Sequence, residues 1–357
     1  MANSEPKAAT LRDVARRAGV SHVTVSRVLS GNLNVTPATS KTVMRAVRAL
    51  KYQPNVAART LVLRRGGNFP ILLQAVVCHA RHSLQTQLPG AFQMQVLQGV
   101  CDAVHTDGHT DFSMSYWRGD EDQERQLARL QRASGVLLMG NSDRELVVRM
   151  KNSGIKLVLA DQDHEGIEID AVVSDNLKGS RAAVRYLLDR GHRHIGWMGG
   201  PAYNNVYRQR EEGVRLELAK ARVPLAPRDC HNASEDDVLF YERAMLEWVR
   251  ADHLPTALVL CSPLAMPGVL HVMREHNLRC PDDISLISLD LDANNAACRP
   301  RPTALATYPQ TIGRQAMERL IKIVRSNTEL PPLKTIVPMH LIEGESVATL
   351  SRASKKK

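Results

Sequence analysis

The stretch TLRDVARRAGVSHVTVSRVLSG, residues 10–31, decides the fold of the first part of the chain. Thr10 is a favourable N-cap, Asp13 follows at capping-box spacing, and the apolar stripe that comes next stops at Gly19, so the pattern predicts a helix over 11–18. Ser21 caps a second helix over about 22–30. Two short helices joined by a glycine turn are typical of a helix-turn-helix, whose second helix enters the major groove of DNA.

The second helix presents an unusual outward face. Its apolar residues Val25, Val28 and Leu29 share one side, and Val23 lies opposite them, near Arg27. Most isolated surface valines have no function. In the major groove, however, arginine pairs with guanine and an apolar side chain can cover the thymine methyl. We therefore expect Val23 to contact a thymine methyl.

A third helix closes the predicted head. After the loop GNLNV, Thr36 is positioned as its cap and Pro37 falls in its first turn, where a missing N–H costs nothing. The apolar stripe Val43, Ala46, Val47 and Leu50 points inward until KYQPN ends the helix. We therefore expect an all-α helix-turn-helix head.

Charge is concentrated in this head. The chain has 47 Lys and Arg against 37 Asp and Glu, and residues 1–66 hold twelve of the basic residues but only two acidic ones. The remaining residues therefore carry 35 of each sign. A basic head on a neutral body indicates binding to a polyanion, because lysine and arginine that neutralise phosphates release condensed counterions.

Composition limits the number of domains, the cellular location and the cysteine chemistry of the protein. At 357 residues and 43% hydrophobic content the chain can bury a large core in two or three domains. We find neither a signal-peptide pattern nor an apolar run long enough to span a membrane, and so expect a cytoplasmic protein. The six cysteines are scattered, with no C-x-x-C and no histidine at metal spacing, so we expect free thiols, no metal and no cofactor.

The body alternates strand-like and helix-like segments from about residue 70 to 340. This is the βαβ pattern of a doubly wound parallel sheet. The strand-like runs are GVLLMG, KLVLADQD, AVVSDN, HIGWMGG, TALVLCS and ISLISLD. G-x-S-x-G, H-E-x-x-H, a P-loop and the dinucleotide glycine spacing are all absent, so we do not expect an enzyme.

The head resembles the LacI/GalR family of transcriptional regulators, without a gap from Thr10 to Leu61. The resemblance implies that the operator-dependent positions of the recognition helix fall on His22 and Val23, followed by Ser26 and Arg27. It also implies a hinge helix beginning at Asn55 whose leucine enters the minor groove and kinks the duplex. The implied DNA-contacting residues are Leu11, Ser21, His22, Val23, Ser26, Arg27, Asn34, Thr36, Asn55, Ala58 and Leu61.

The body resembles the same family in VVSDNLKGSRAAVRYLLDRGHRHIGWMGGP, residues 172–201, and in CPDDISLISLD, residues 280–290. The resemblance implies a two-lobed, periplasmic-binding-protein-like body with three crossovers and a ligand in the cleft. The expected division is a head over 1–54, hinge and linker over 55–68, an effector-binding and dimerisation domain over 69–345, and a flexible basic tail over 346–357.

The candidate effector residues follow strand ends, where open parallel sheets bind ligands. Arg208 stands at the spacing where the family places its effector-contacting arginine, and Asp290 ends a strand. An arginine donates and a carboxylate accepts, so the pair can hold vicinal hydroxyls or a purine edge. Asp161, Asn204 and Ser262 are further candidates.

Departures from the family keep the effector unidentified. Many relatives have Asn-Asp where this chain has Ser262 and Pro263, and the last strand ends Asp-Leu instead of Asp-Asp. The segment 75–99 lacks the usual short loop with paired aromatics and contains His79 and His82.

The resulting prediction is a homodimeric repressor that binds a near-palindromic operator and responds to a small molecule, such as a sugar or related metabolite. Two alternatives stay open: a regulator whose body has lost or changed effector binding, and a non-specific architectural DNA protein.

Overall fold

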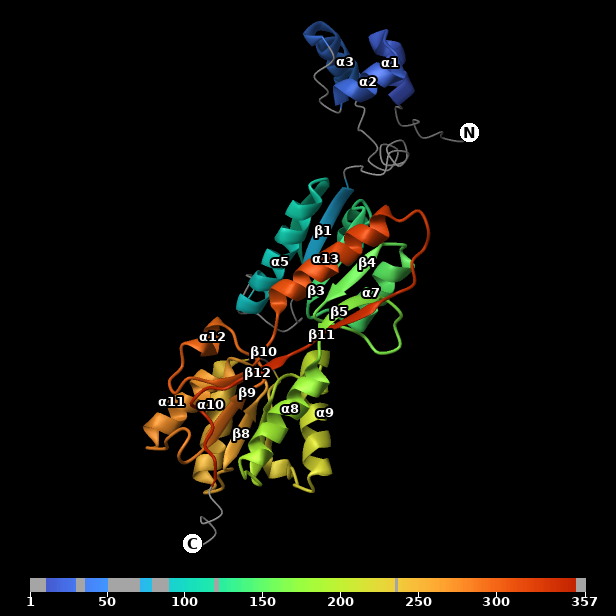
Figure 1. Cartoon of the computed structure of the whole chain (residues 1–357). Coiled ribbons are helices and arrows are strands. Elements are labelled where there is room, and N and C mark those ends of the chain that lie inside the picture. Colours follow the sequence, from blue (N-terminus) through green and yellow to red (C-terminus); the bar gives the residue numbers. More distant parts are fainter. Residues whose placement is uncertain are drawn as a thin grey trace. The chain divides into compact units, whose positions relative to one another are not determined.

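The computed structural model describes residues 11–29, 36–50, 71–78, 90–118, 122–234 and 237–350 (Figure 1). The chain divides into two compact units, residues 1–69 and residues 70–357. Within the described residues, no helix has the length and apolar character needed to cross a membrane.

The first unit contains the three predicted helices. They are α1 (Leu11–Ala18), α2 (His22–Leu29) and α3 (Pro37–Ala49). Two of the three predicted caps are present, since the Thr24 N–H donates to Ser21 Oγ at 3.1 Å and the Thr39 N–H donates to Thr36 Oγ1 at 3.3 Å. The third predicted cap, Thr10, lies outside the described residues. The three helices pack around a small core of Val14, Ala15, Val25, Val43 and Ala46. The helix predictions for the head are confirmed.

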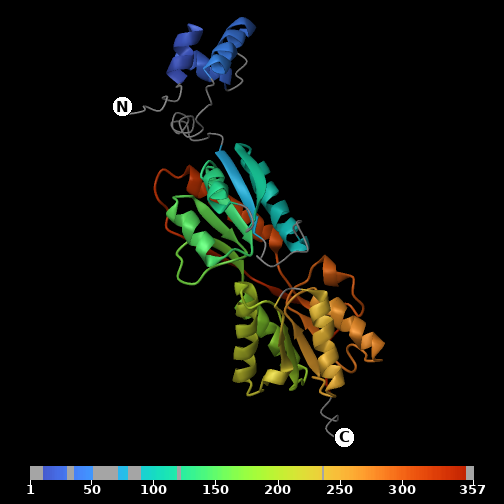
Figure 2. The same cartoon turned by 180° about the vertical axis from the view of Figure 1, so that it is seen from behind.

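The second unit has two lobes, each built around a six-stranded sheet (Figure 2). The first sheet has the order β11-β5-β4-β3-β1-β2 and is parallel throughout. The second has the order β12-β10-β9-β8-β6-β7, in which only β12 runs antiparallel. The predicted fold class, an α/β two-lobed body of doubly wound sheets, is confirmed.

The strands and helices of this unit have the following bounds. The strands are β1 (Ile71–Cys78), β2 (Thr110–Trp117), β3 (Gly135–Gly140), β4 (Leu157–Ala160), β5 (Asp170–Ser174), β6 (Ile195–Gly199), β7 (Cys230–Asn232), β8 (Ala257–Leu260), β9 (Ser285–Ser288), β10 (Thr303–Ala306), β11 (Lys334–Val337) and β12 (His340–Ile342). The helices are α5 (Ala91–Asp107), α6 (Gln123–Leu130), α7 (Arg144–Asn152), α8 (Asn176–Asp189), α9 (Asn205–Lys220), the 3-10 turn η2 (Pro227–Asp229), α10 (Val238–Arg250), α11 (Ala265–Glu275), α12 (Ala293–Ala296) and α13 (Pro309–Arg325).

The chain passes between the lobes three times, as predicted. It leaves the first sheet after β5, returns after β10 so that α13 packs against α5, and crosses a last time between β11 and β12 (Figure 1). Since all crossovers follow strand ends, the carboxyl ends of both sheets point toward the junction of the lobes.

Two glycines bring α5 and α13 into close contact in the first lobe. A Cβ atom on Gly313 would lie 1.9 Å from the Val96 carbonyl oxygen, and one on Gly99 would lie 1.9 Å from the Gln310 carbonyl oxygen. No real side chain fits at these distances, so the helix pair depends on both glycines.

The end of the described chain is part of the second lobe. Ser346 is fully buried. Its hydroxyl donates to the Leu286 carbonyl at 2.6 Å and accepts from the Thr303 N–H at 2.8 Å. The Leu350 N–H donates to the Arg190 carbonyl at 2.8 Å. The first residues of the predicted tail, 346–350, therefore belong to the fold, because their backbone completes hydrogen bonds that the sheet would otherwise leave open.

Candidate functional site

The outward face of α2 is the candidate DNA-reading surface. His22 and Val23 are exposed, with 45% of Val23 accessible, whereas Val25 on the opposite face is fully buried. An exposed apolar side chain on a polar helix face is available for contact with a thymine methyl. Ser21 and Thr36 are exposed at the starts of α2 and α3, where their hydroxyls act as caps.

Several predicted DNA contacts cannot be placed. Leu11, Ser26 and Arg27 belong to α1 and α2, but their side chains lie outside the described part of the structure. Asn34, Asn55, Ala58 and Leu61 lie outside the described residues altogether.

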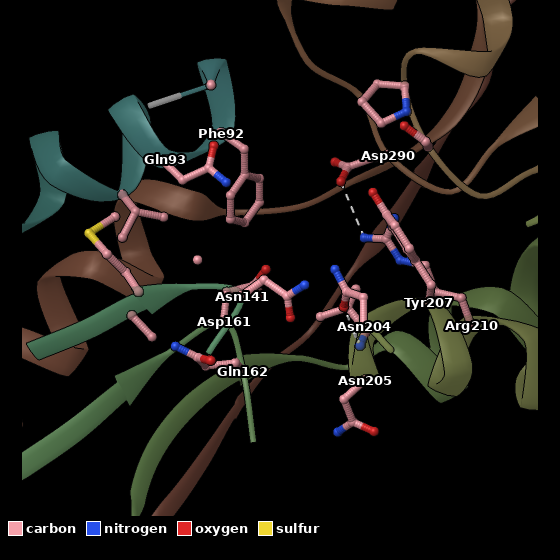
Figure 3. Close-up of a pocket in the computed structure, with 18 of the residues that line it drawn as sticks. Phe92, Gln93, Asn141, Asp161, Gln162, Asn204, Asn205, Tyr207, Arg210 and Asp290 are labelled. Atoms are coloured by element: carbon pink, nitrogen blue, oxygen red, sulfur yellow. Dashed lines mark hydrogen bonds and ion pairs between the residues drawn. The ribbon is translucent and has the colours of Figure 1, made fainter. Parts of the chain in front are cut away.

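A pocket of about 270 Å³ lies where the carboxyl ends of the two sheets meet (Figure 3). This volume is near the lower end of the range for small-molecule sites, roughly 300–1,000 Å³. The pocket brings together all five residues that the sequence nominated for effector binding. They are Asp161 from the first lobe and Asn204, Arg208, Ser262 and Asp290 from the second.

The arginine that pairs with Asp290 is Arg210, not the expected Arg208. Arg210 is 3% exposed, and its Nη2 lies 3.2 Å from Asp290 Oδ2. Its Nε donates to Asn176 Oδ1 at 3.0 Å and its Nη1 donates to the Cys261 carbonyl at 2.7 Å. Arg208 is exposed at the pocket edge and donates to Asn205 Oδ1 at 2.9 Å. The buried guanidinium is therefore fixed in place by three partners.

The helical periodicity of α9 indicates which of the two arginines, Arg208 or Arg210, faces inward. In α9 the buried residues include Arg210, Gly213, Val214 and Glu217, so Arg210 belongs to the inward stripe. Arg208 is off that stripe by about 200° at 100° per residue. The family spacing points to Arg208, whereas the inward stripe of α9 contains Arg210.

Asp290 is held in position on both oxygens. Its Oδ1 accepts the Thr307 hydroxyl at 2.8 Å and the Leu291 N–H at 3.0 Å, while Oδ2 faces Arg210. The Asn295 amide donates to the Asp290 carbonyl at 2.9 Å and fixes the turn after β9. Protein groups thus hold the carboxylate in one orientation.

Asp161 is the second carboxyl of the pocket and has an unusual environment. It has φ of 55°, and its Oδ1 accepts the Ser174 hydroxyl at 3.1 Å. Burial raises its pKa to about 7, an effect that Arg210 opposes and the negative charge of Asp290 reinforces. Near neutral pH this carboxyl can therefore act either as a hydrogen-bond donor or as an acceptor.

A polar network lines the first-lobe wall. The Ser142 hydroxyl donates to Gln162 Oε1 at 2.5 Å and lies 3.2 Å from His164 Nε2. Gln162 in turn donates to the Leu138 carbonyl at 3.2 Å. Burial lowers the pKa of His164, so its ring is neutral at physiological pH.

Asp163 links the two lobes beside the pocket. Its Oδ1 accepts the Asn205 amide at 2.5 Å and the Gln209 amide at 3.1 Å, both from α9. Its Oδ2 forms an ion pair with Lys334 of β11. The structure therefore has the lobes hydrogen-bonded to one another at the pocket edge.

Two aromatic side chains lie on opposite sides of the pocket. The Phe92 ring at the start of α5 points into the pocket, and Tyr207 lies on the opposite side (Figure 3). Phe92 belongs to the segment 75–99, which lacks the paired aromatics of the family's short loop. The described part of that segment lies in β1, at Gly90 and in α5. His79 and His82 fall outside the described residues.

The remaining nominated residues also have local structural roles. Asn204 caps α9, since its Oδ1 accepts the Val206 N–H at 2.9 Å. Ser262 accepts the Leu264 N–H at 3.2 Å and is fully buried. Gln93 and Asn141 line the pocket and were not foreseen, because a single glutamine or asparagine carries no distinctive sequence pattern.

Two family models match separate parts of the chain. Residues 10–55 match the bacterial regulatory proteins of the lacI family, and residues 184–347 match a periplasmic binding protein-like domain. Together these cover the helix-turn-helix and most of the second lobe.

Curated relatives and solved structures match almost the whole chain. Catabolite control protein A of Priestia megaterium is 26% identical over 89% of this chain and 93% of its own length. The HTH-type transcriptional repressor PurR of Klebsiella pneumoniae (strain 342) is 28% identical over 95% of this chain and 97% of its own length.

Among solved structures, the transcriptional regulator CelR–cellobiose complex has 26% identity and a TM-score of 0.69, over 95% of this chain and 99% of that one. The Lac repressor dimer bound to operator and the anti-inducer ONPF has 21% identity and a TM-score of 0.70, which shows a shared fold, over 96% of this chain and 100% of that one. With relatives aligned nearly end to end, the chain joins a helix-turn-helix of the lacI family of bacterial regulatory proteins to a two-lobed, periplasmic binding protein-like body.

Proposed function

We propose that this chain is a transcriptional repressor whose operator binding is controlled by a small molecule held between Asp161, Arg210 and Asp290. The observation that carries the proposal is the pre-oriented Arg210–Asp290 pair inside a polar pocket at the carboxyl ends of both sheets. A buried, hydrogen-bonded ion pair at such a position is typical of a ligand site.

The pocket chemistry favours a polyhydroxylated ring as the effector. The guanidinium of Arg210 donates, the carboxylate of Asp290 accepts, and the carboxyl of Asp161 can do either near neutral pH. The Phe92 face offers an apolar platform. Alternating hydroxyls of a sugar or a related metabolite match such a set of donors and acceptors. Arg208, Asn204 and Ser262 are proposed as additional contacts. One relative of known structure is a cellobiose complex, which supports this class.

The head is proposed to read DNA through α2. His22, Val23, Ser26 and Arg27 contact base edges, Leu11, Ser21, Asn34 and Thr36 support the docking, and Asn55, Ala58 and Leu61 act from a hinge over 55–68. The chain acts as a homodimer on a near-palindromic operator, because a two-fold protein fits two-fold DNA. It works in the bacterial cytoplasm, where the chromosome lies, and catalyses no reaction.

Effector control follows from the two-lobed body. A ligand that contacts both lobes changes their relative position and thereby biases the order of the hinge. Typical coupling free energies are about 1–3 kcal/mol, so operator affinity would change by roughly 5- to 150-fold.

The test starts with operator selection from random DNA and a thermal-shift screen of sugars and related metabolites on the purified protein. The hit is then added to operator-binding titrations of wild type, Asp290→Asn and Arg208→Ala. We expect both variants to bind operator as the wild type does without the metabolite and to lose the response to it. A full response in both variants would place the effector elsewhere.

The two alternatives give different results in the same experiment. A body that has lost effector binding gives a selected operator but no stabilising metabolite. A non-specific architectural protein binds random DNA as tightly as any selected sequence.

A further inference from the structure

Three side chains with metal-ligand chemistry meet at the amino-terminal end of the second sheet. His194 directly precedes β6, Asp229 ends η2 directly before β7, and His253 lies between α10 and β8. This end of the sheet is opposite to the carboxyl ends that form the effector pocket. The cluster is therefore separate from the proposed regulatory site.

The cluster converges on one carboxylate oxygen. His194 Nε2 lies 3.0 Å from Asp229 Oδ1, and His253 Nε2 lies 2.7 Å from the same oxygen. All three potential ligand atoms are within 4.8 Å of one another. The two imidazole rings are 4.8 Å apart between centroids and tilted by 50°, so they approach the carboxylate from different directions.

This geometry suits a divalent ion of the late transition series. Zinc holds imidazole nitrogen and carboxylate oxygen at about 2.0–2.2 Å, so ligand atoms on one ion lie roughly 3–4 Å apart. Movements of about 1 Å or less at the imidazole nitrogens bring the three atoms to these separations. Two histidines and one carboxylate are also a common zinc ligand set.

Burial leaves room for a fourth, solvent ligand. The Asp229 side chain is only 7% exposed, whereas His194 and His253 are 37% and 25% exposed. The carboxylate is thus fixed inside the lobe and the two histidines face partly toward water. Such a site is rigid on one side and accessible to an entering ion on the other.

We propose that His194, Asp229 and His253 bind one Zn²⁺ ion that clamps together the segments leading into β6, β7 and β8. The segments already share main-chain bonds, since the Thr256 N–H donates to the His194 carbonyl at 2.9 Å. An ion bound to all three favours the folded second lobe, because the ligands are widely separated in the unfolded chain.

The test uses full-length protein stripped with a chelator and then titrated with zinc chloride by calorimetry. To remove another source of zinc binding, all proteins carry His79→Gln and His82→Gln. We expect one ion per chain and a rise in melting temperature of roughly 5 °C at saturating zinc. Cobalt in place of zinc is expected to give visible absorption bands of a four-coordinate site.

Ligand variants decide the assignment. His253→Gln and, separately, His194→Gln should weaken zinc binding at least about tenfold and remove the thermal shift. Glutamine can still donate to Asp229, and melting in chelator shows that each variant folds. His276→Gln, at an exposed histidine after α11, is the matched control and should bind zinc as the parent does. Zinc binding within threefold of the parent in both ligand variants, or no binding by the parent, overturns the proposal.

Discussion

Replacing Asp161 by asparagine is expected to stabilise the second unit against unfolding, and to do so more strongly at alkaline than at acidic pH. Burial raises the pKa of this carboxyl from 3.8 to about 7 in the folded protein. Asparagine carries no charge at any pH and its oxygen can still accept the Ser174 hydroxyl. The variant therefore removes the cost of a buried charge and keeps the hydrogen bond.

The size and sign of the stabilisation by Asp161→Asn follow from proton linkage. Between pH 3.8 and about 7 the folded wild type holds a proton that the unfolded chain has lost, so its free energy of unfolding falls as the pH rises and becomes constant above pH 7. At about 1.4 kcal/mol per pH unit, this interval corresponds to an upper value of about 4 kcal/mol. Because Asp161 is partly accessible, we expect Asp161→Asn to gain about 2–4 kcal/mol at pH 8 and about 1 kcal/mol at pH 5.

Urea unfolding followed by tryptophan fluorescence measures this gain. The three tryptophans, Trp117, Trp197 and Trp248, all lie in the second unit, so the signal reports on that unit. Asp111→Asn, which removes an exposed carboxyl on β2, is the matched control and should change the free energy of unfolding by less than about 0.5 kcal/mol at both pH values.

A gain from Asp161→Asn that is the same at pH 5 and pH 8 would refute the reasoning. The carboxyl would then ionise at its ordinary pKa in the folded protein, and the burial argument for Asp161 would be wrong. A loss of stability at pH 8 would mean that attraction to Arg210 outweighs desolvation.

Three further predictions concern the head and the first lobe. Arg27→Ala should lower specific operator affinity by about 1–3 kcal/mol and relax the preference at one base pair of each half-site in a binding-site selection; an unchanged preference would remove Arg27 from base readout. Uracil in place of thymine at one symmetric position of the operator should weaken wild-type binding by about 1 kcal/mol per half-site, because the methyl group is lost. The same replacement should have little effect on operator binding by Val23→Ala. Equal losses in the two proteins at every thymine would mean that Val23 is a surface residue without a base contact. Gly313→Ala should lower the free energy of unfolding, measured with urea, by about 2–3 kcal/mol, because its Cβ would lie 1.9 Å from the Val96 carbonyl oxygen. A decrease below about 0.5 kcal/mol would show that α5 and α13 can move apart without cost.

The head could be derived from sequence because its signals are local. Caps at Ser21 and Thr36, the stop at Gly19 and stripes of period 3.6 all act within one or two helical turns, and the structure has the helices where these signals predict them. Six central strands could be predicted equally well, because strands covered on both faces are continuous apolar runs. They are β3, β4, β5, β6, β8 and β9. Strands β1, β2, β7, β10, β11 and β12 were not among the predicted runs. Of these, β2, β7, β11 and β12 carry polar or charged residues, which interrupt the apolar pattern.

The sites depend on which strand ends and loops the sheets bring together. Sequence spacing nominated Arg208, but the packing of α9 buries Arg210 against Asp290, eighty residues further along the chain. Phe92 reaches the pocket because α5 begins at the lobe junction, toward which β1 runs. His194, Asp229 and His253 meet because β6, β7 and β8 are neighbours in the second sheet. Sequence therefore determined most of the elements and the resemblance to the lacI family, through forces that act over a few residues. Only the tertiary structure decided which side chains share a site, because strand order sets distances between residues that are far apart in the chain.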